Sequence, residues 1–114
     1  MNKNQSRLRR AKRTRMNFKF QPLPRLTVFK SSKHLYAQVI EPDGNKVITS
    51  ASSHDKSISE KTSNLKTAEK IGQLIAERAL ENGIKKVVFD RSGYLYHGKI
   101  KMIAESARSS GLEI

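Results

Sequence analysis

Two short stretches with alternating side chains, RLTVFK (25–30) and LYAQVI (35–40), constrain the fold most strongly. Both are rich in branched and aromatic residues, and SSKH (31–34) between them is typical of a turn, so the pattern predicts an antiparallel hairpin. A loop over 31–34 places Lys30 opposite Leu35, and the pairs then continue to Leu26 opposite Val39. Side chains alternate between the two faces of a sheet, so one face must line the core. The predicted core face carries Leu26, Val28, Leu35, Ala37 and Val39.

The opposite face of this hairpin mixes aromatic and polar side chains, and two interpretations fit it equally well. Such a surface can stack on nucleotide bases and hydrogen-bond to them. Alternatively, its aromatic residues pair across the strands and stabilise an ordinary sheet. We expect the two aromatic rings to be partly exposed, with polar residues beside them. The members of this face are Arg25, Thr27, Phe29, Tyr36, Gln38 and Ile40.

The segments after the hairpin predict one α/β domain. Residues 41–45 form a strong turn signal, and KVITSAS (46–52) follows as a third strand, antiparallel to the second. A polar stretch at 52–64 precedes a helical pattern at 65–83, which Asn82 and Gly83 end. Residues 84–90 predict a buried strand, and residues 98–110 predict a second helix. Residues 112–114 predict a short strand at the edge of the sheet. The inward positions of the two helices are Ala68, Ile71, Gly72, Ile75 and Ala79, and Ile100, Ile103, Ala104 and Ala107.

We therefore expect an α/β fold with a single domain at 25–114, preceded by a basic N-terminal arm and proline linker at 1–24. The domain has a mixed sheet of about four strands, in the order βββ-α-β-α, with two helices.

Positive charge is concentrated at the start of the chain. The net charge is +13, eleven of the 23 Lys and Arg residues lie within 1–33, and no acidic residue precedes Glu41. Residues 34–114 contain 12 basic and 10 acidic residues, a net charge of +2. A basic arm on a nearly neutral body predicts a polyanionic partner, because Lys and Arg displace counterions from phosphates.

The arm itself, residues 1–20, carries eight basic residues and no continuous apolar stripe at helical spacing. We expect repulsion between like charges to keep it open when it is alone. An Arg-rich start without acidic residues is also typical of an organellar transit peptide, but Ser is scarce and no amphipathic face forms.

Several classes of protein are disfavoured by what the sequence lacks. There is no cysteine, which excludes disulfides and thiolate metal sites. No run of about 18 apolar residues predicts a transmembrane helix, and no apolar segment near Met1 predicts a secretory signal.

The segment DRSGYLYHGK (90–99) connects the predicted buried strand to the second helix. Ligands of α/β sheets commonly bind at this position, and free N–H groups at a helix start favour phosphate. Arg91 and Lys99 supply charge, while Tyr94, Tyr96 and His97 have flat faces for bases or sugars. We interpret the segment as an RNA-gripping loop in which Asp90 has a structural role and caps the following turn. The alternative is that the tyrosines only pack beneath the loop.

Catalysis is the weaker interpretation of this loop. A two-metal nuclease needs several converging carboxylates, and the loop supplies only Asp90. No spacing links His97 to a nucleophile, and His34 and His54 are isolated in the sequence. There is no zinc-binding HxxxH pattern and no phosphate-binding glycine fingerprint. We expect no enzyme activity, no metal site and no cofactor.

The segment VVFDRSGYLYHGKIKMIAESARSSGLEI (87–114) resembles the C-terminal signature of the bacterial large-subunit ribosomal protein L-eighteen family, which binds 5S rRNA. The similarity extends to RLTVFKSSKHLYAQVI, EPDGNKVITSAS, AEKIGQLIAERALENGI and the Arg-rich start, and FDRSGYLYHGKIK is specific to this family. The resemblance implies a structural protein of the cytoplasmic large ribosomal subunit, monomeric outside the ribosome. Its implied partners are 5S rRNA, the large rRNA of the central protuberance and neighbouring ribosomal proteins, but no membrane.

By this match, the RNA-contacting regions are the arm, the first hairpin and the 90–99 loop. Phe29 departs from the family pattern, because that strand position tolerates polar residues. The candidate RNA-binding residues are Arg7, Arg9, Arg10, Lys12, Arg13, Arg15, Arg25, Thr27, Phe29, Lys33, His34, Tyr36, Gln38, Arg91, Tyr94, Tyr96, His97 and Lys99.

Two other classes of protein remain as alternatives. A basic-armed nucleic-acid chaperone or DNA-binding protein would bind duplexes of any sequence with similar affinity. An RNase H-like enzyme has a loosely similar order of elements, but it would need a cluster of acidic residues.

Overall fold

The computed structural model describes residues 2–18, 23–31, 34–42, 46–55 and 65–114. Lys33, residues 43–45 of the predicted 41–45 turn and most of the polar 52–64 stretch lie outside these ranges. Seven elements are present within them: α1 (Lys3–Phe18), β1 (Arg25–Lys30), β2 (Leu35–Ile40), β3 (Val47–Ser52), α2 (Leu65–Glu81), β4 (Val88–Asp90) and α3 (Gly98–Ser109).

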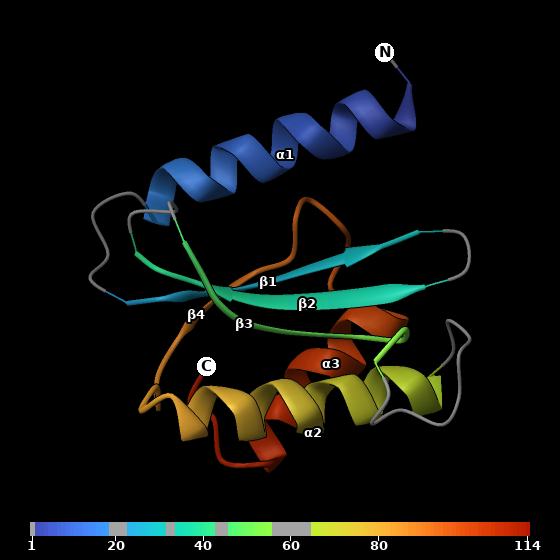
Figure 1. Ribbon diagram of the computed structural model, residues 1–114. Helices are drawn as coiled ribbons and strands as arrows, with labels where there is room; N and C mark the ends of the chain where they lie inside the picture. The colour runs from blue at the N-terminus through green and yellow to red at the C-terminus, as the bar shows by residue number, and fades with distance from the viewer. Residues whose placement is uncertain (1, 19–22, 32–33, 43–45, 56–64) are drawn as a thin grey trace.

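The strands form one mixed sheet in the spatial order β3-β2-β1-β4 (Figure 1). β2 is antiparallel to both β1 and β3, whereas β4 runs parallel to β1. A parallel neighbour needs a crossover connection, and α2 supplies it. The predicted α/β domain with a four-stranded mixed sheet and the order βββ-α-β-α is confirmed.

The first hairpin has the predicted register. Lys30 pairs with Leu35, Leu26 pairs with Val39, and the ladder ends at Arg25 opposite Ile40. All five residues of the predicted core face are completely buried. The alternation of the two strands was therefore sufficient to select the correct inner face.

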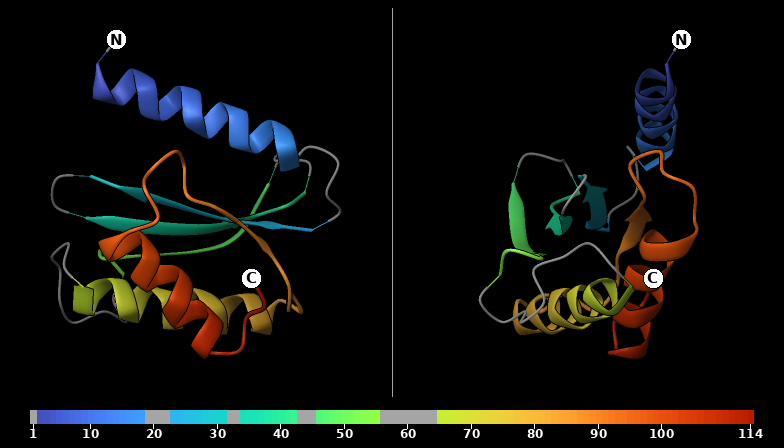
Figure 2. Two further views of the ribbon diagram at one scale, coloured as in Figure 1. Left: turned by 180° about the vertical axis from the view of Figure 1, so that it is seen from behind. Right: turned by 90° about the vertical axis from the view of Figure 1, so that its right-hand side faces the viewer.

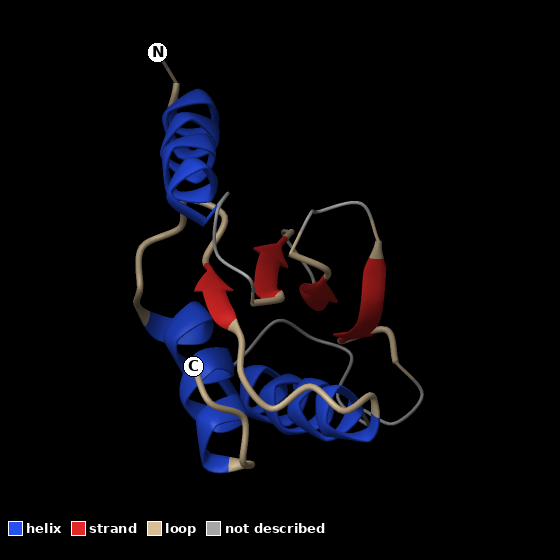
Figure 3. Ribbon diagram, turned by 90° about the vertical axis from the view of Figure 1, so that its left-hand side faces the viewer, coloured by secondary structure: helices blue, strands red, loops and turns tan. Residues whose placement is uncertain are grey.

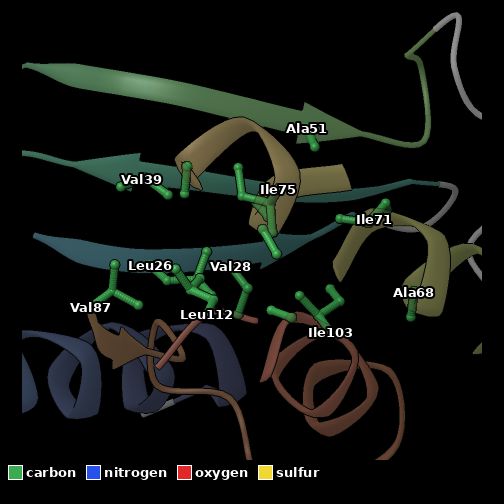
Figure 4. Packing of buried hydrophobic residues seen from close by; sticks show 14 of the residues in the cluster. Leu26, Val28, Val39, Ala51, Ala68, Ile71, Ile75, Val87, Ile103 and Leu112 are labelled. Carbon is green, nitrogen blue, oxygen red and sulfur yellow. The ribbon is translucent and has the colours of Figure 1, made fainter. Parts of the chain in front are cut away.

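The sheet separates the helices. α2 and α3 cover one face, and α1 lies on the other side, above the β4 edge (Figures 2 and 3). Within the described residues, no helix is long and apolar enough to cross a bilayer. The hydrophobic core fills the space between the sheet and the α2–α3 layer, where Ile71, Ile75 and Ile103 meet Leu26 and Val28 (Figure 4).

Strand β4 is shorter than the predicted 84–90. It begins at Val88, and the preceding residues are held instead by a parallel bridge between Lys86 and Glu113. The Val87 N–H donates to the Glu113 carbonyl over 2.9 Å. The C-terminal segment therefore closes this edge of the core and buries Leu112.

Helices α2 and α3 pack closely, and Gly72 is at the point of contact. The predicted inward positions of both helices are buried. A Cβ atom on Gly72 would lie 2.6 Å from the Ile103 carbonyl oxygen and 2.6 Å from the Ser106 Cβ. Ser106 Oγ donates to the Glu69 carbonyl over 2.6 Å, which fixes the same crossing.

We predict that Gly72→Ala lowers the free energy of unfolding by about 1–3 kcal/mol, because the added methyl overpacks the helix crossing. Gln73→Ala, at the exposed neighbouring position, should change it by less than about 0.5 kcal/mol. Urea denaturation of both variants measures the difference. Equal stabilities for the two variants would contradict the close packing at Gly72.

Candidate nucleic-acid interface

The 91–97 loop is organised from beneath by Asp90, the last residue of β4. Its side chain is completely buried. One carboxylate oxygen accepts from the Ser92 N–H over 3.0 Å, and the other accepts from Thr27 Oγ1 over 3.5 Å. Ser92 and Gly93 both have positive φ, 55° and 79°. The prediction that Asp90 is structural and caps the turn is confirmed.

This turn presents two backbone carbonyls to α1. Arg7 Nη1 donates to the Ser92 carbonyl over 2.9 Å, and Arg10 Nε donates to the Gly93 carbonyl over 3.0 Å. Gly93 also touches the α1 backbone directly, because a Cβ there would overlap the Arg7 carbonyl oxygen. Ala11 is completely buried in the contact.

The expectation of an open arm is therefore wrong for the described part of α1, Lys3–Phe18. The helix is held by guanidinium-to-carbonyl hydrogen bonds and by one close backbone approach. Hydrogen bonds from charged donors are stronger than neutral ones, so two of them can offset part of the repulsion along the helix. A search for apolar residues at helical spacing does not detect docking of this kind, because hydrogen bonds and a backbone contact hold the helix.

Tyr94 connects the loop to the end of β1. Its hydroxyl donates to the Lys30 carbonyl over 3.1 Å and lies 3.4 Å from the Lys30 N–H. The Arg7 guanidinium carbon lies 4.6 Å from the centre of the Tyr94 ring, and Lys30 Nζ lies 5.3 Å from it. Tyr94 is thus a structural link beneath two cations, and base stacking on its ring would compete with these contacts.

The remainder of the loop faces outward. Arg91 and His97 are exposed, Tyr96 is 37% exposed, and Leu95 is 75% exposed. The Tyr96 ring rests edge-on against Phe89 with 6.0 Å between the ring centres. Lys99 is half-buried in the first turn of α3. The RNA-contacting role of these residues stays a prediction.

On the outer face of the hairpin, the structure corrects one expectation. Thr27 is only 2% exposed, because it pairs with Asp90 of β4 and donates to its carboxylate. It therefore does not present its side chain to a partner. Phe29, Tyr36, Gln38 and the neighbouring Arg25 remain partly exposed, as expected.

A small aromatic cluster lies where β2 begins and β3 ends. The rings of His34 and His54 are 3.6 Å apart between centres, and Tyr36 Oη lies 3.3 Å from His54 Nε2. His34 Nδ1 lies 2.7 Å from Ser53 Oγ. His54 was missed in the sequence because it was treated as isolated. A predicted register between β2 and β3 would have found it, because Tyr36 pairs with Ser52 and this pairing places His54 near the Tyr36 ring.

Among the arm candidates, Arg7 is half-buried and used to hold the helix, whereas the others with described side chains are exposed. Helix α1 contains no acidic residue. In the parts of the chain that the structure describes, no three His, Asp or Glu residues gather as a metal ion would require. The exposed arm candidates are Arg9, Arg10, Lys12 and Arg13; the side chain of Arg15 and all of Lys33 lie outside the described set.

The whole chain, residues 1–114, matches the model of the family described as ribosomal L18 of archaea, bacteria, mitochondria and chloroplasts. The chain belongs to this family. Among its relatives named "Large ribosomal subunit protein uL18", that of Colwellia psychrerythraea is 51% identical over 116 residues, covering 99% of both chains. Those of Pseudomonas aeruginosa and Psychrobacter cryohalolentis are 50% and 52% identical over 112 residues, covering 97% of both chains. The resemblance noted in the sequence is thereby confirmed for the L18 family.

We predict that Gly93→Ala releases α1 from this L18 chain, because the methyl group cannot fit against the Arg7 carbonyl. Gly83→Ala is a matched control: its φ of 78° is almost the same as the 79° of Gly93, but nothing lies within 4 Å of its Cβ position. Both variants carry a left-handed backbone cost of about 1–2 kcal/mol.

The measurement is the rate of trypsin cleavage within α1, together with amide hydrogen exchange of the same residues. Gly93→Ala should raise both, and Gly83→Ala should leave both close to the values of the unchanged chain. Equal protection of α1 in the two variants would contradict the docking contact.

Proposed function

We propose that this chain binds 5S rRNA through one surface built from α1, the 91–97 loop and the outer side of the hairpin. We further propose that it helps attach 5S rRNA to the large rRNA in the central protuberance. As a member of the L18 family with bacterial relatives, the chain is a structural protein of the cytoplasmic large ribosomal subunit. The prediction that it is not an enzyme is confirmed by this membership.

The docked α1 helix is the observation that carries the RNA proposal. Seven of its sixteen residues are basic and none is acidic. Arg7 and Arg10 hold the helix on the loop, while Arg9, Lys12 and Arg13 stay exposed. A rigid row of cations suits a phosphate backbone, because phosphate contacts fix position and orientation on a nucleic acid.

The distribution of acidic residues supports the same orientation. Among the described residues, the exposed acidic side chains lie on α2 or α3 or follow α3 in the chain. In Figure 3 the strands lie between this layer and α1. The α1 side therefore faces RNA in our proposal, and the α2–α3 layer faces away from it. These exposed acids are Glu69, Glu77, Glu81, Glu105 and Glu113.

The choice of 5S rRNA depends on the segment FDRSGYLYHGKIK. Gly93 and Asp90 of this segment shape the turn on which α1 docks. The segment therefore has a structural role that a general phosphate-binding loop does not need. A general chaperone or DNA-binding protein would obtain its affinity from the arm charges alone. Our proposal instead requires both the arm and the loop.

We predict that the double variant Arg9→Ala/Arg13→Ala weakens binding to 5S rRNA and flattens its salt dependence. The slope of log affinity against log salt should shrink by about 0.7–0.9 for each phosphate that the variant no longer neutralises. Lys66→Ala/Lys85→Ala removes the same charge from exposed positions at the two ends of the α2 layer and serves as the control. Filter binding over a range of salt concentrations measures both.

An unrelated RNA duplex of similar length completes this experiment. The unchanged chain should bind 5S rRNA more tightly than the duplex at the same salt concentration. Equal affinity for the two RNAs would contradict the 5S proposal and favour a general nucleic-acid-binding protein.

A further inference from the structure

We propose that a hollow between α1, the end of β1 and the 91–97 loop accepts a single unpaired nucleotide of the bound RNA. Its phosphate would lie against the cations that line the hollow, and its base against Leu95 and His97. The inference rests on the proposed RNA-binding function, and it names the kind of nucleotide that this part of the surface selects.

The hollow has the size of a small-ligand site, and its lining is rich in positive charge. Its volume is about 500 Å³. Sites for small molecules commonly have roughly 300–1,000 Å³. Four cationic side chains line it, and among the described residues no Asp or Glu lines any part of it. The cations are Lys3, Arg7, Arg10 and Lys30.

Two of these cations are held in place before any RNA arrives. Arg7 donates to the Ser92 carbonyl and to Asn4 Oδ1, and its guanidinium lies over the Tyr94 ring. Arg10 is fixed by the Gly93 carbonyl. A preorganised charge loses less conformational entropy on binding than a free one. Lys3 and Lys30 are exposed and can move to meet the phosphate.

The other side chains that line the hollow are aromatic or aliphatic, and two of them, Leu95 and His97, are exposed to solvent. Leu95 is 75% exposed, the largest exposed fraction among the large apolar side chains of the described residues. His97 is exposed beside it and makes no side-chain hydrogen bond that caps α3. Ile100, at 2% exposure, also lines the hollow. A base has two flat apolar faces and could cover Leu95, which the protein alone leaves in water.

A paired base cannot use this site. In an A-form duplex the bases are stacked, and the readable minor groove is wide and shallow. Extruding a paired base costs a few kcal/mol, so a nucleotide that is already unpaired in a loop or bulge is preferred. The concave shape and the exposed Leu95 thus add selectivity for unpaired RNA to the phosphate contacts of α1.

The test compares Leu95→Ala with Leu65→Ala, a control at a 51% exposed leucine at the start of α2. Leu95→Ala should weaken binding to 5S rRNA by about 5- to 30-fold, because most of the leucine's apolar area is no longer buried against the base. The control should bind like the unchanged chain. Chemical probing of base edges in the complex should reveal an unpaired nucleotide that the unchanged chain protects and that Leu95→Ala leaves reactive.

Lys3→Ala distinguishes the phosphate contact from the base contact. It should reduce the salt slope by about 0.7–0.9 and leave the base protected, whereas Leu95→Ala should free the base and leave the slope unchanged. Tight 5S binding with the same protected bases in Leu95→Ala and Leu65→Ala would overturn this inference and leave the proposed function intact. Failure of the unchanged chain to bind 5S rRNA would overturn the proposed function itself.

Discussion

The buried carboxylate of Asp90 is the group on which the candidate interface depends. It is completely buried at the end of β4 and accepts hydrogen bonds from the Ser92 N–H and from the Thr27 hydroxyl. A buried carboxylate is costly unless its oxygens are satisfied, so these bonds confine the chain to one path after β4. That path turns the Ser92 and Gly93 carbonyls toward α1. Asp90 thereby fixes the sheet end of the loop, and Arg7 and Arg10 hold the basic helix on the two carbonyls that the loop presents.

The sequence predicted well the parts of the fold that hydrophobic burial controls. Leu26, Val28, Leu35, Ala37 and Val39 alternate with residues of the mixed aromatic and polar face, and a slip of one residue in either strand would turn its buried side chains outward. The spacing of the inward residues on α2 and α3 was similarly informative. In each case the buried face makes apolar residues recur at the spacing of a strand or a helix. This periodicity can be recognised without knowing which element packs against that face.

The candidate site was less predictable because its contacts use other chemistry and join distant parts of the chain. Arg7 binds a carbonyl 85 residues away, and Arg10 binds one 83 residues away. Any residue supplies a carbonyl, so no pattern of residue types marks the acceptor. Thr27 was expected at the surface because the parallel pairing with β4 could not be seen from β1 alone. His54 meets Tyr36 only once β3 lies beside β2.

The long distance in sequence between α1 and the loop on which it docks affects the order of events during synthesis. The basic helix is among the first segments to be made, but Ser92 and Gly93 follow it by about 85 residues. At typical rates of about 5–20 residues per second, α1 waits roughly 4–17 s before its docking partner exists. During that interval the newly made cationic segment is free to meet any nearby polyanion. Completion of the C-terminal third is therefore the step that gives the helix a fixed orientation on the body.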